Sequence, residues 1–271
     1  MEASARVALG SLRHFFLDMD GTIYLGPHSI SGAAEFVAYL RKSGRNFLFF
    51  TNNPTLDARK YSEKLAGMGI EARPEDVLTS GEALARYLVS QTPYRRLYVL
   101  GTPSFEEELR RAGLELTQKE PDAVVLSFDK TLTYAKLEQA ALLLREGLPY
   151  LATNPDKVCP TEYGPIPDCG AIAALLREAT GRTPKYAGKP NAEMIIMGMQ
   201  KLGASPRAAA MVGDRTYTDM QMAYNAGITS VLVLSGETKE EDIEHLDRKP
   251  DYVFGSVAEL HAALAGADAG Q

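Results

Sequence analysis

Short apolar runs alternate with helix-like segments along most of this chain, and this alternation restricts the folds that it can adopt. Apolar runs lie at residues 15–17, 123–126 and 208–212, and the strand-like segment at residues 46–50 is apolar after Asn46. Runs of this length without polar alternation are typical of strands buried on both faces of a sheet. The helix-like segments between them favour a parallel sheet covered by helices on both faces. The sequence therefore predicts an α/β fold.

Two further patterns make local predictions. Apolar residues at helical spacing predict a helix over residues 31–43, with Ser31 as its N-cap and Gly44 as its stop. Residues 157–168 contain three prolines and a glycine, which predicts an irregular loop. Helical spacing also predicts a helix over residues 218–226.

Two aspartates follow the first apolar run. Asp18 and Asp20 are separated by one residue and precede Gly21, which allows a sharp turn. Ligands of open α/β sheets bind beyond the carboxyl ends of the strands, and alternation along an extended chain points both carboxylates the same way. A hard divalent cation such as Mg²⁺, bridged to a phosphate substrate, would offset their repulsion. A simple polar turn explains this segment alone equally well, so other positions decide.

Further polar groups follow other predicted strands, and together they favour phosphoryl transfer. They are Thr51, Asn52, Asn53, Lys189, Asp214 and Asp219. Asp18 would be the nucleophile that forms an aspartyl-phosphate, and Asp20 would act as acid and then base. Thr51 and the backbone amides of residues 52 and 53 would bind phosphate oxygens.

The remaining charged groups fit the same chemistry. Lys189 would stabilise the negative charge that develops on the transferred group. Asp214 would complete the Mg²⁺ ligands. Asp219 would hold the waters of the cation or pair with Lys189.

In order along the chain, these segments resemble the four motifs of the haloacid dehalogenase superfamily. They read Asp18-Met19-Asp20-Gly21-Thr22, Thr51-Asn52-Asn53, Gly188-Lys189-Pro190 and Gly213-Asp214-Arg215 with Asp219. More narrowly, the chain resembles the NagD and 4-nitrophenylphosphatase branch, whose signature includes Asp-x-Asp-Gly-Thr-x-Tyr. The resemblance extends over nearly the whole chain.

The resemblance implies a Rossmann-like parallel-sheet core with an inserted α/β cap of the C2 type. The core would comprise residues 1–80 and 187–271 and carry the catalytic groups, and the cap would comprise residues 81–186 and select the substrate. Independently, an interval of that length without structure of its own would be uncommon. A large cap implies small phosphorylated substrates.

The resemblance also implies roles for single residues. Asp18 is then the nucleophile and a Mg²⁺ ligand, and Asp20 is the acid and base and a ligand through its backbone carbonyl. Asp214 is the third protein ligand, and Asp219 lies beside the ligands without binding the cation directly. Thr51, Asn52, Asn53 and Lys189 bind the phosphate. In the cap, the roles of Asn154, Asp168 and Cys169 stay open.

Composition excludes several other classes of protein. The net charge of −6 over 271 residues gives no basic surface for nucleic acid. The only two cysteines, Cys159 and Cys169, are too few for a disulfide scaffold, and the chain shows neither a secretory leader nor an apolar run of 18 residues. We therefore expect a cytoplasmic protein without membrane or nucleic-acid partners, and a homodimer as a possible assembly.

The sequence thus predicts a Mg²⁺-dependent phosphatase that hydrolyses small phosphomonoesters through an aspartyl-phosphate. The candidate substrates are 4-nitrophenyl phosphate, sugar phosphates or nucleotide monophosphates. Two alternatives use the same fold: a phosphotransferase, and a non-catalytic regulatory protein that binds a phosphorylated metabolite. Asp20 favours catalysis, because a binding protein does not need an acid and base at that position. The physiological substrate is not encoded in these motifs.

Overall fold

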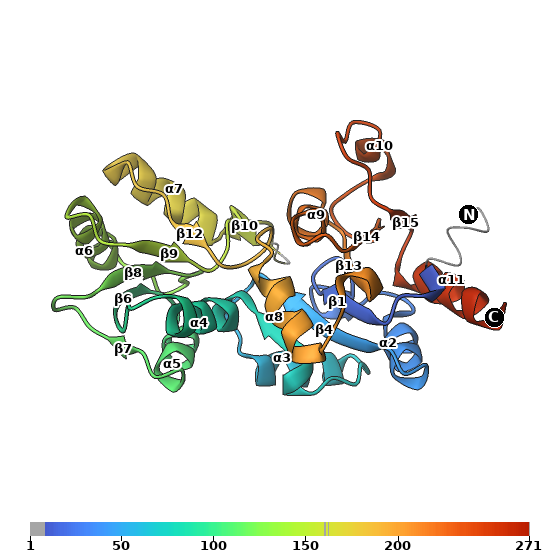
Figure 1. Cartoon of the computed structure of the whole chain (residues 1–271). Coiled ribbons are helices and arrows are strands. Elements are labelled where there is room, and N and C mark those ends of the chain that lie inside the picture. The colour runs from blue at the N-terminus through green and yellow to red at the C-terminus, as the bar shows by residue number, and fades with distance from the viewer. Residues whose placement is uncertain (1–8, 160, 162, 271) are drawn as a thin grey trace. The chain divides into compact units, whose positions relative to one another are not determined.

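The chain folds into two compact units, seen in a computed structural model that describes residues 9–159, 161 and 163–270 (Figure 1). Unit 1 comprises the described residues of Met1–Phe50, Tyr61–Leu78 and Ile195–Gln271, and unit 2 comprises those of Thr51–Lys60 and Thr79–Met194. Both units contain parallel sheets with helices, which confirms the α/β prediction. The catalytic and substrate-selecting roles expected for the two parts of the chain stay a prediction.

Unit 1 is built on a sheet in which β1 (His14–Asp18) lies between β13 (Ala209–Gly213) and β4 (Asn46–Thr51). Both neighbours run parallel to β1, and Phe16 pairs in register with Met211 and Leu48. The sheet continues through β14 (Thr229–Val233) and β15 (Tyr252–Phe254) on one side and β5 (Val77–Thr79) on the other. Because the strands are parallel, β1 and β13 end at the same edge, at Asp18 and Gly213.

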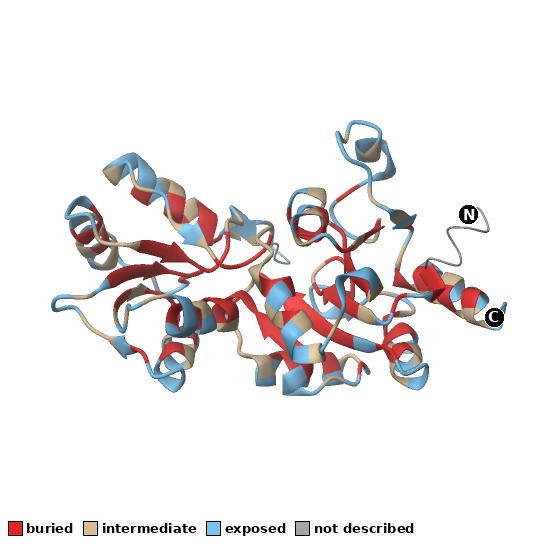
Figure 2. Ribbon diagram, in the orientation of Figure 1, coloured by how far each residue is buried: buried red, intermediate tan, exposed pale blue. Residues whose placement is uncertain are grey.

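The central strand has no polar alternation because both of its faces are covered. Phe15, Phe16 and Leu17 are fully buried. Figure 2 shows the strands of this sheet mainly in red, the colour of buried residues. Phe15 packs edge-on against Phe36, with the ring centroids 6.3 Å apart, and Phe16 packs against Phe50 at 5.0 Å. The continuous apolar run therefore reflects burial between two layers of side chains.

Helices, short turns and a small hairpin complete unit 1. They are α2 (Ala33–Lys42), α3 (Ala58–Gly67), η1 (Pro74–Asp76), α8 (Glu193–Leu202), η2 (Pro206–Ala208), η3 (Thr216–Met220), α9 (Gln221–Ala226), α10 (Glu240–Ile243), α11 (Val257–Ala269), β2 (Tyr24–Leu25) and β3 (His28–Ser29). The first residues of α3 and α8 belong to unit 2.

The prediction that Ser31 caps the helix of residues 31–43 is wrong. The N-cap of α2 is Gly32, with φ of 83° and no side-chain cap hydrogen bond. A Cβ at this position would lie 2.6 Å from Cβ of Ala258, at the start of α11. Glycine is therefore required by both the left-handed backbone and the close approach of the two helices.

Unit 2 contains a second parallel sheet with helices on both faces. Its strands, in spatial order, are β12 (Lys185–Tyr186), β9 (Tyr150–Ala152), β8 (Ala123–Leu126), β6 (Arg96–Leu100) and β7 (Glu115–Leu116). The bounds of β8 agree with the apolar run at residues 123–126 that predicts it. Val124 and Leu126 pack with α6 (Tyr134–Arg145) and α7 (Cys169–Thr180). Ala123 and Val125 pack with α4 (Ser80–Gln91) and α5 (Pro103–Arg111), as the alternation of a strand requires.

The loop predicted at residues 157–168 is not wholly irregular, which corrects the sequence interpretation. It contains a short antiparallel hairpin of β10 (Val158–Cys159) and β11 (Ile166–Pro167). The hairpin could not be predicted from the sequence because each of its strands has two residues, too few for a periodic pattern. None of the described helices is long and apolar enough to cross a membrane.

The C-terminal helix of unit 1 is held by one charged cluster. The Asp268 carboxylate accepts hydrogen bonds from Arg45 Nη1 at 2.8 Å and Nη2 at 2.7 Å, and a further one from the Tyr39 hydroxyl. The Arg45 side chain is buried, and its hydrogen bonds are the main reason that the pKa of Asp268 falls to about 2. The cluster joins α11 to the segment between α2 and β4.

We expect Asp268→Asn to lower the free energy of unfolding at pH 7 by about 1 kcal/mol, since Asp268 is partly exposed and water screens the pair. The carboxylate stabilises the fold fully above its unfolded pKa of 3.8, and this contribution is lost as the pH falls through about 2. Melting temperatures of wild type and variant should therefore differ at pH 7 and converge towards pH 2. Asp247→Asn, an exposed aspartate, is the control. Equal melting temperatures at pH 7 would contradict this role.

Candidate active site

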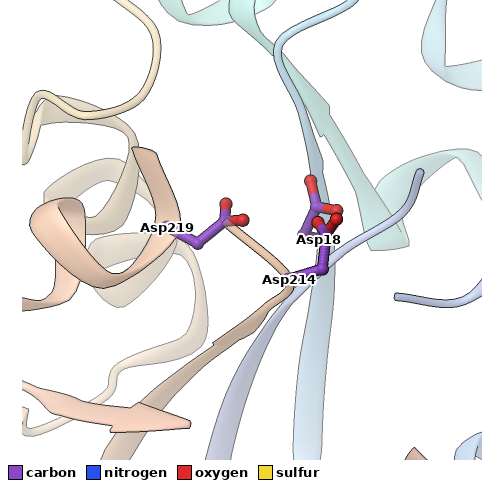
Figure 3. A group of neighbouring side chains, drawn as sticks. All are labelled: Asp18, Asp214 and Asp219. Atoms are coloured by element: carbon purple, nitrogen blue, oxygen red, sulfur yellow. The ribbon is translucent and has the colours of Figure 1, made fainter. Parts of the chain in front are cut away.

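Three aspartates of unit 1 gather at the carboxyl ends of β1 and β13. Asp18, Asp214 and Asp219 are all buried, and one carboxylate oxygen of each lies within 4.8 Å of the others. Figure 3 shows the three side chains converging from different segments. Asp18 is the last residue of β1, Asp214 follows β13, and Asp219 lies in η3. The structure thus brings together three of the residues that the sequence analysis selected.

Residues 218–226 are helical, as predicted, but the first turn is not α-helical. A π-helical turn, η3, precedes α9, so the α-helix begins only at Gln221. Asp219 Oδ2 accepts a hydrogen bond from the backbone N–H of Arg215 at 3.1 Å. The wide turn directs this carboxylate back towards the end of β13, and such turns are frequent at functional sites.

Asp214 has two oxygens in different environments. Oδ2 accepts a hydrogen bond of 2.7 Å from the backbone N–H of Glu237. Oδ1 is buried and has no hydrogen-bond partner in the part of the chain that the structure describes. Burial, followed by the charges of Asp18 and Asp219, raises the pKa of Asp214 to about 8. The protein alone therefore disfavours a charged carboxylate here.

These carboxylates fit a divalent cation. A cation bound among Asp18, Asp214 and Asp219 would offset their repulsion and give Asp214 Oδ1 the partner that the described residues do not supply. Carboxylate oxygens are the ligands that hard cations prefer. The family resemblance implies that Asp219 lies beside the ligands, and its carboxylate lies within the same group. Whether Asp219 binds the cation directly or indirectly stays a prediction.

Asp214 is wedged between two glycines. A Cβ at Gly236 or at Gly21 would overlap the Asp214 carboxylate. The Ser235 hydroxyl donates a hydrogen bond of 2.7 Å to the carbonyl of Gly21, which joins the two glycine segments. Composition gave no signal for the contribution of residues 235–237, because a backbone N–H donor has no sequence signature.

Asp20 lies outside the group of three carboxylates. Its Oδ2 accepts a hydrogen bond from the hydroxyl of the fully buried Tyr24 at 3.2 Å, and Asp20 and Tyr24 also form a backbone bridge. The ammonium of Lys64 lies 3.6 Å from the centroid of the Tyr24 ring. Sequence reasoning did not select Tyr24 as a site residue, although the tyrosine in the Asp-x-Asp-Gly-Thr-x-Tyr signature was the available signal.

The other predicted site residues belong to unit 2. Lys189 is buried, and its backbone N–H donates to Asn52 Oδ1 at 2.9 Å. Thr51 Oγ1 accepts a hydrogen bond of 3.0 Å from the backbone N–H of Asn53. Asn53 Oδ1 in turn accepts from the backbone and hydroxyl of Thr55. Within this unit, Thr51, Asn52, Asn53 and Lys189 are therefore joined although 136 positions separate Asn53 from Lys189.

Comparisons with known proteins decide the family. The haloacid dehalogenase-like hydrolase model matches residues 15–115, and a second model of HAD-hydrolase-like proteins matches residues 186–260. An acid sugar phosphatase of Staphylococcus aureus is 37% identical over 251 residues, which is 92% of this chain and 97% of that protein. This chain belongs to the haloacid dehalogenase-like hydrolase family.

Solved structures of this family resemble the chain over almost its full length. A 4-nitrophenylphosphatase from Thermotoga maritima is 44% identical with a TM-score of 0.91, covering 95% of this chain and 99% of that chain. NagD from E. coli K-12 is 29% identical with a TM-score of 0.87, covering 92% and 98%. A glycerol phosphate phosphatase from Mycobacterium tuberculosis, solved with magnesium, is 32% identical with a TM-score of 0.88, covering 94% and 78%. This haloacid dehalogenase-like hydrolase is a phosphatase of the NagD-like branch, as its motifs imply.

We expect Gly236→Ala to destabilise this hydrolase by about 1–3 kcal/mol, because the added methyl group overlaps Asp214 and forces the loop or the carboxylate to move. Melting temperature measures the effect. Gly67→Ala is the matched control, since a Cβ at that helical position meets no atom within 4 Å. An unchanged melting temperature for Gly236→Ala would show that the space beside the Asp214 carboxylate can accommodate the added methyl group.

Proposed function

We propose that this phosphatase hydrolyses small phosphomonoesters through an aspartyl-phosphate on Asp18. The observation that supports this most strongly is the buried group of Asp18, Asp214 and Asp219 at the carboxyl ends of two adjacent parallel strands. A carboxylate in that position matches the first motif of the family, and its neighbours supply the charge that a cation would neutralise.

Mg²⁺ is the cation that we propose, held by Asp18, Asp214 and the backbone carbonyl of Asp20. When bound, it neutralises phosphate charge and orients the substrate. The unpartnered oxygen of Asp214 supports this assignment, because a buried carboxylate oxygen is costly without a partner. The M. tuberculosis relative was solved with magnesium, which agrees with this choice.

The chain's own residues then perform two displacements. An oxygen of Asp18 attacks phosphorus, the P–O bond to the leaving group breaks, and Asp20 gives its proton to the departing oxygen. Asp20 next takes a proton from water, whose oxygen attacks the phosphorus and releases Asp18 and inorganic phosphate. The Tyr24 hydroxyl, 3.2 Å from Asp20 Oδ2, fits a group that holds this carboxyl in place.

The phosphate-binding roles are proposed for Thr51, Asn52, Asn53 and Lys189. The positive charge of Lys189 would stabilise the negative charge that develops on the phosphoryl oxygens. Its neighbours would donate hydrogen bonds to the same oxygens. In the structure the Asn53 N–H donates to Thr51 Oγ1, so this role for Asn53 requires the donor to exchange partners when phosphate binds.

Sugar phosphates and similar small esters are the substrate class that we propose. The relatives include an acid sugar phosphatase and a glycerol phosphate phosphatase. Unit 2, with its own sheet and helices, would select among such substrates. A cytoplasmic location and a homodimer agree with the sequence and belong to the same proposal.

Asp18→Asn tests the nucleophile. We expect the variant to lose at least about 10⁴-fold in kcat for 4-nitrophenyl phosphate while its melting temperature stays near that of wild type, because the amide cannot form the acyl phosphate. Asp247→Asn is the matched control. Turnover by Asp18→Asn at the wild-type rate would overturn the assignment. Adding glycerol as an acceptor distinguishes hydrolysis from phosphoryl transfer, since only transfer yields a glycerol phosphate.

Removal of the cation gives a second test. We expect EDTA to abolish activity and Mg²⁺ to restore it, because the clustered carboxylates need a counter-charge. Mg²⁺ at about 100 times its Kd should also stabilise the wild type by about 2.7 kcal/mol, seen as a raised melting temperature. Asp214→Asn should show little of this stabilisation. Full activity in excess chelator would remove the cation from the mechanism.

A further inference from the structure

The side chain of Asn52 pairs with both backbone groups of Lys189. The Lys189 N–H donates to Asn52 Oδ1 at 2.9 Å, and Asn52 Nδ2 donates to the Lys189 carbonyl at 3.1 Å. Both residues are buried, Asn52 with 7% of its surface exposed and Lys189 with 3%. A carboxamide offers a donor and an acceptor side by side, which a carboxylate or an aliphatic group does not. The Asn52 side chain thus pairs with the backbone of Lys189 as the backbone of a neighbouring strand would.

The same amide also reaches a third segment of unit 2. Asn52 Nδ2 donates to Asp156 Oδ2 at 3.1 Å, and Asn154 Nδ2 approaches that oxygen at 3.4 Å. The Ser80 hydroxyl donates to the carbonyl of Asn52 at 2.6 Å, which fixes the backbone of Asn52 itself. One side chain therefore connects the segment after β4, the loop after β9 and the backbone of Lys189.

We propose that Asn52 is a positioning residue that acts through Lys189. It fixes the backbone from which the Lys189 side chain extends, and it ties that backbone to the loop at Asp156. This inference rests on the proposed function, in which Lys189 stabilises charge on the phosphoryl group. It assigns the side chain of Asn52 a task different from the phosphate contact expected of its backbone amide.

The physical reason lies in the reach of lysine. Its ammonium is carried on a four-carbon stem, so the position of the backbone limits the points that the charge can occupy. Charge stabilisation depends on a group that is already in place before the reaction, and displacements of about 1 Å can cost about 100-fold in rate. A buried pair of hydrogen bonds at the root of the side chain limits such shifts.

Asn52→Asp is the most specific test because it keeps the shape of the side chain and replaces its NH₂ group with an oxygen. The carboxylate still accepts from the Lys189 N–H, but an oxygen now faces two acceptors, the Lys189 carbonyl and Asp156 Oδ2. We expect kcat for 4-nitrophenyl phosphate to fall at least about tenfold and KM to change less than about threefold, as for loss of a group that acts in the transition state. Asn46→Asp, an exposed asparagine at the start of β4, is the control.

A rescue variant tests the arrangement independently of stability. Asp156→Asn alone should be mild, because its amide oxygen still accepts from Asn52. Combined with Asn52→Asp, it supplies a donor opposite the new carboxylate, and we expect recovery of a large part of the lost kcat. No recovery in a folded double variant would count against the contact with Asp156.

A double variant that also lacks the Lys189 side chain shows whether Asn52 acts through Lys189. In Lys189→Ala, adding Asn52→Asp should lower kcat no further, because the group being positioned is already gone. A fully additive loss would overturn the inference and leave a merely structural role. Circular dichroism at the assay temperature identifies folded variants, and Asn52→Ala, which adds no charge, replaces Asn52→Asp if that variant does not fold.

Failure of the proposed function and failure of the role of Asn52 give different results. Full activity of Lys189→Ala would remove the proposed role of Lys189 and the inference with it. Wild-type kcat in folded Asn52→Asp, together with an inactive Lys189→Ala, would overturn the inference alone. A lower melting temperature with unchanged kcat would likewise reduce Asn52 to a stabilising residue.

Discussion

Mutual repulsion among three buried carboxylates is the constraint on which unit 1 depends. Asp18, Asp214 and Asp219 have oxygens within 4.8 Å of one another, and the raised pKa of Asp214 expresses the cost of charging them together. A fold optimised for stability alone would separate or neutralise such groups. Their presence together at the edge of a well-packed sheet fits a site that binds a cation. The phosphatase activity of the relatives agrees with such a site.

The protein meets this constraint mainly with backbone groups. The Glu237 N–H binds one oxygen of Asp214, the Arg215 N–H binds Asp219, and two glycines leave room for the Asp214 carboxylate. Backbone donors at fixed positions need no rotamer ordering when a ligand arrives. They also leave the other oxygen of Asp214 without a partner among the described residues, so the side chain is oriented without being neutralised.

In unit 2, a single side chain orients other groups in a comparable way. Asn52 serves Lys189 and Asp156 at once, so three segments that lie far apart in sequence depend on one carboxamide. Motif comparison places Asn52 in a phosphate-binding triplet and says nothing of this pairing. The structure thereby suggests why the position after Thr51 carries an amide: an aspartate there would face two acceptors.

Sequence alone determined the class of fold, the central strands and the identity of the motif residues, because apolar periodicity and residue chemistry are local properties. The buried run at β1, the bounds of β8, and the choice of Asp18, Asp214 and Lys189 as candidates all follow from it. Only the tertiary structure decided the Gly32 cap, the hairpin of β10 and β11, the π-turn before α9 and the pairings of Tyr24, Glu237 and Asn52. The Gly32 cap and the pairings of Glu237 and Asn52 arise from contacts between segments distant along the chain. The hairpin and the π-turn depend on backbone groups that every residue shares, and the Tyr24 pairing depends on how two nearby side chains are oriented. None of these leaves a periodic trace in the sequence.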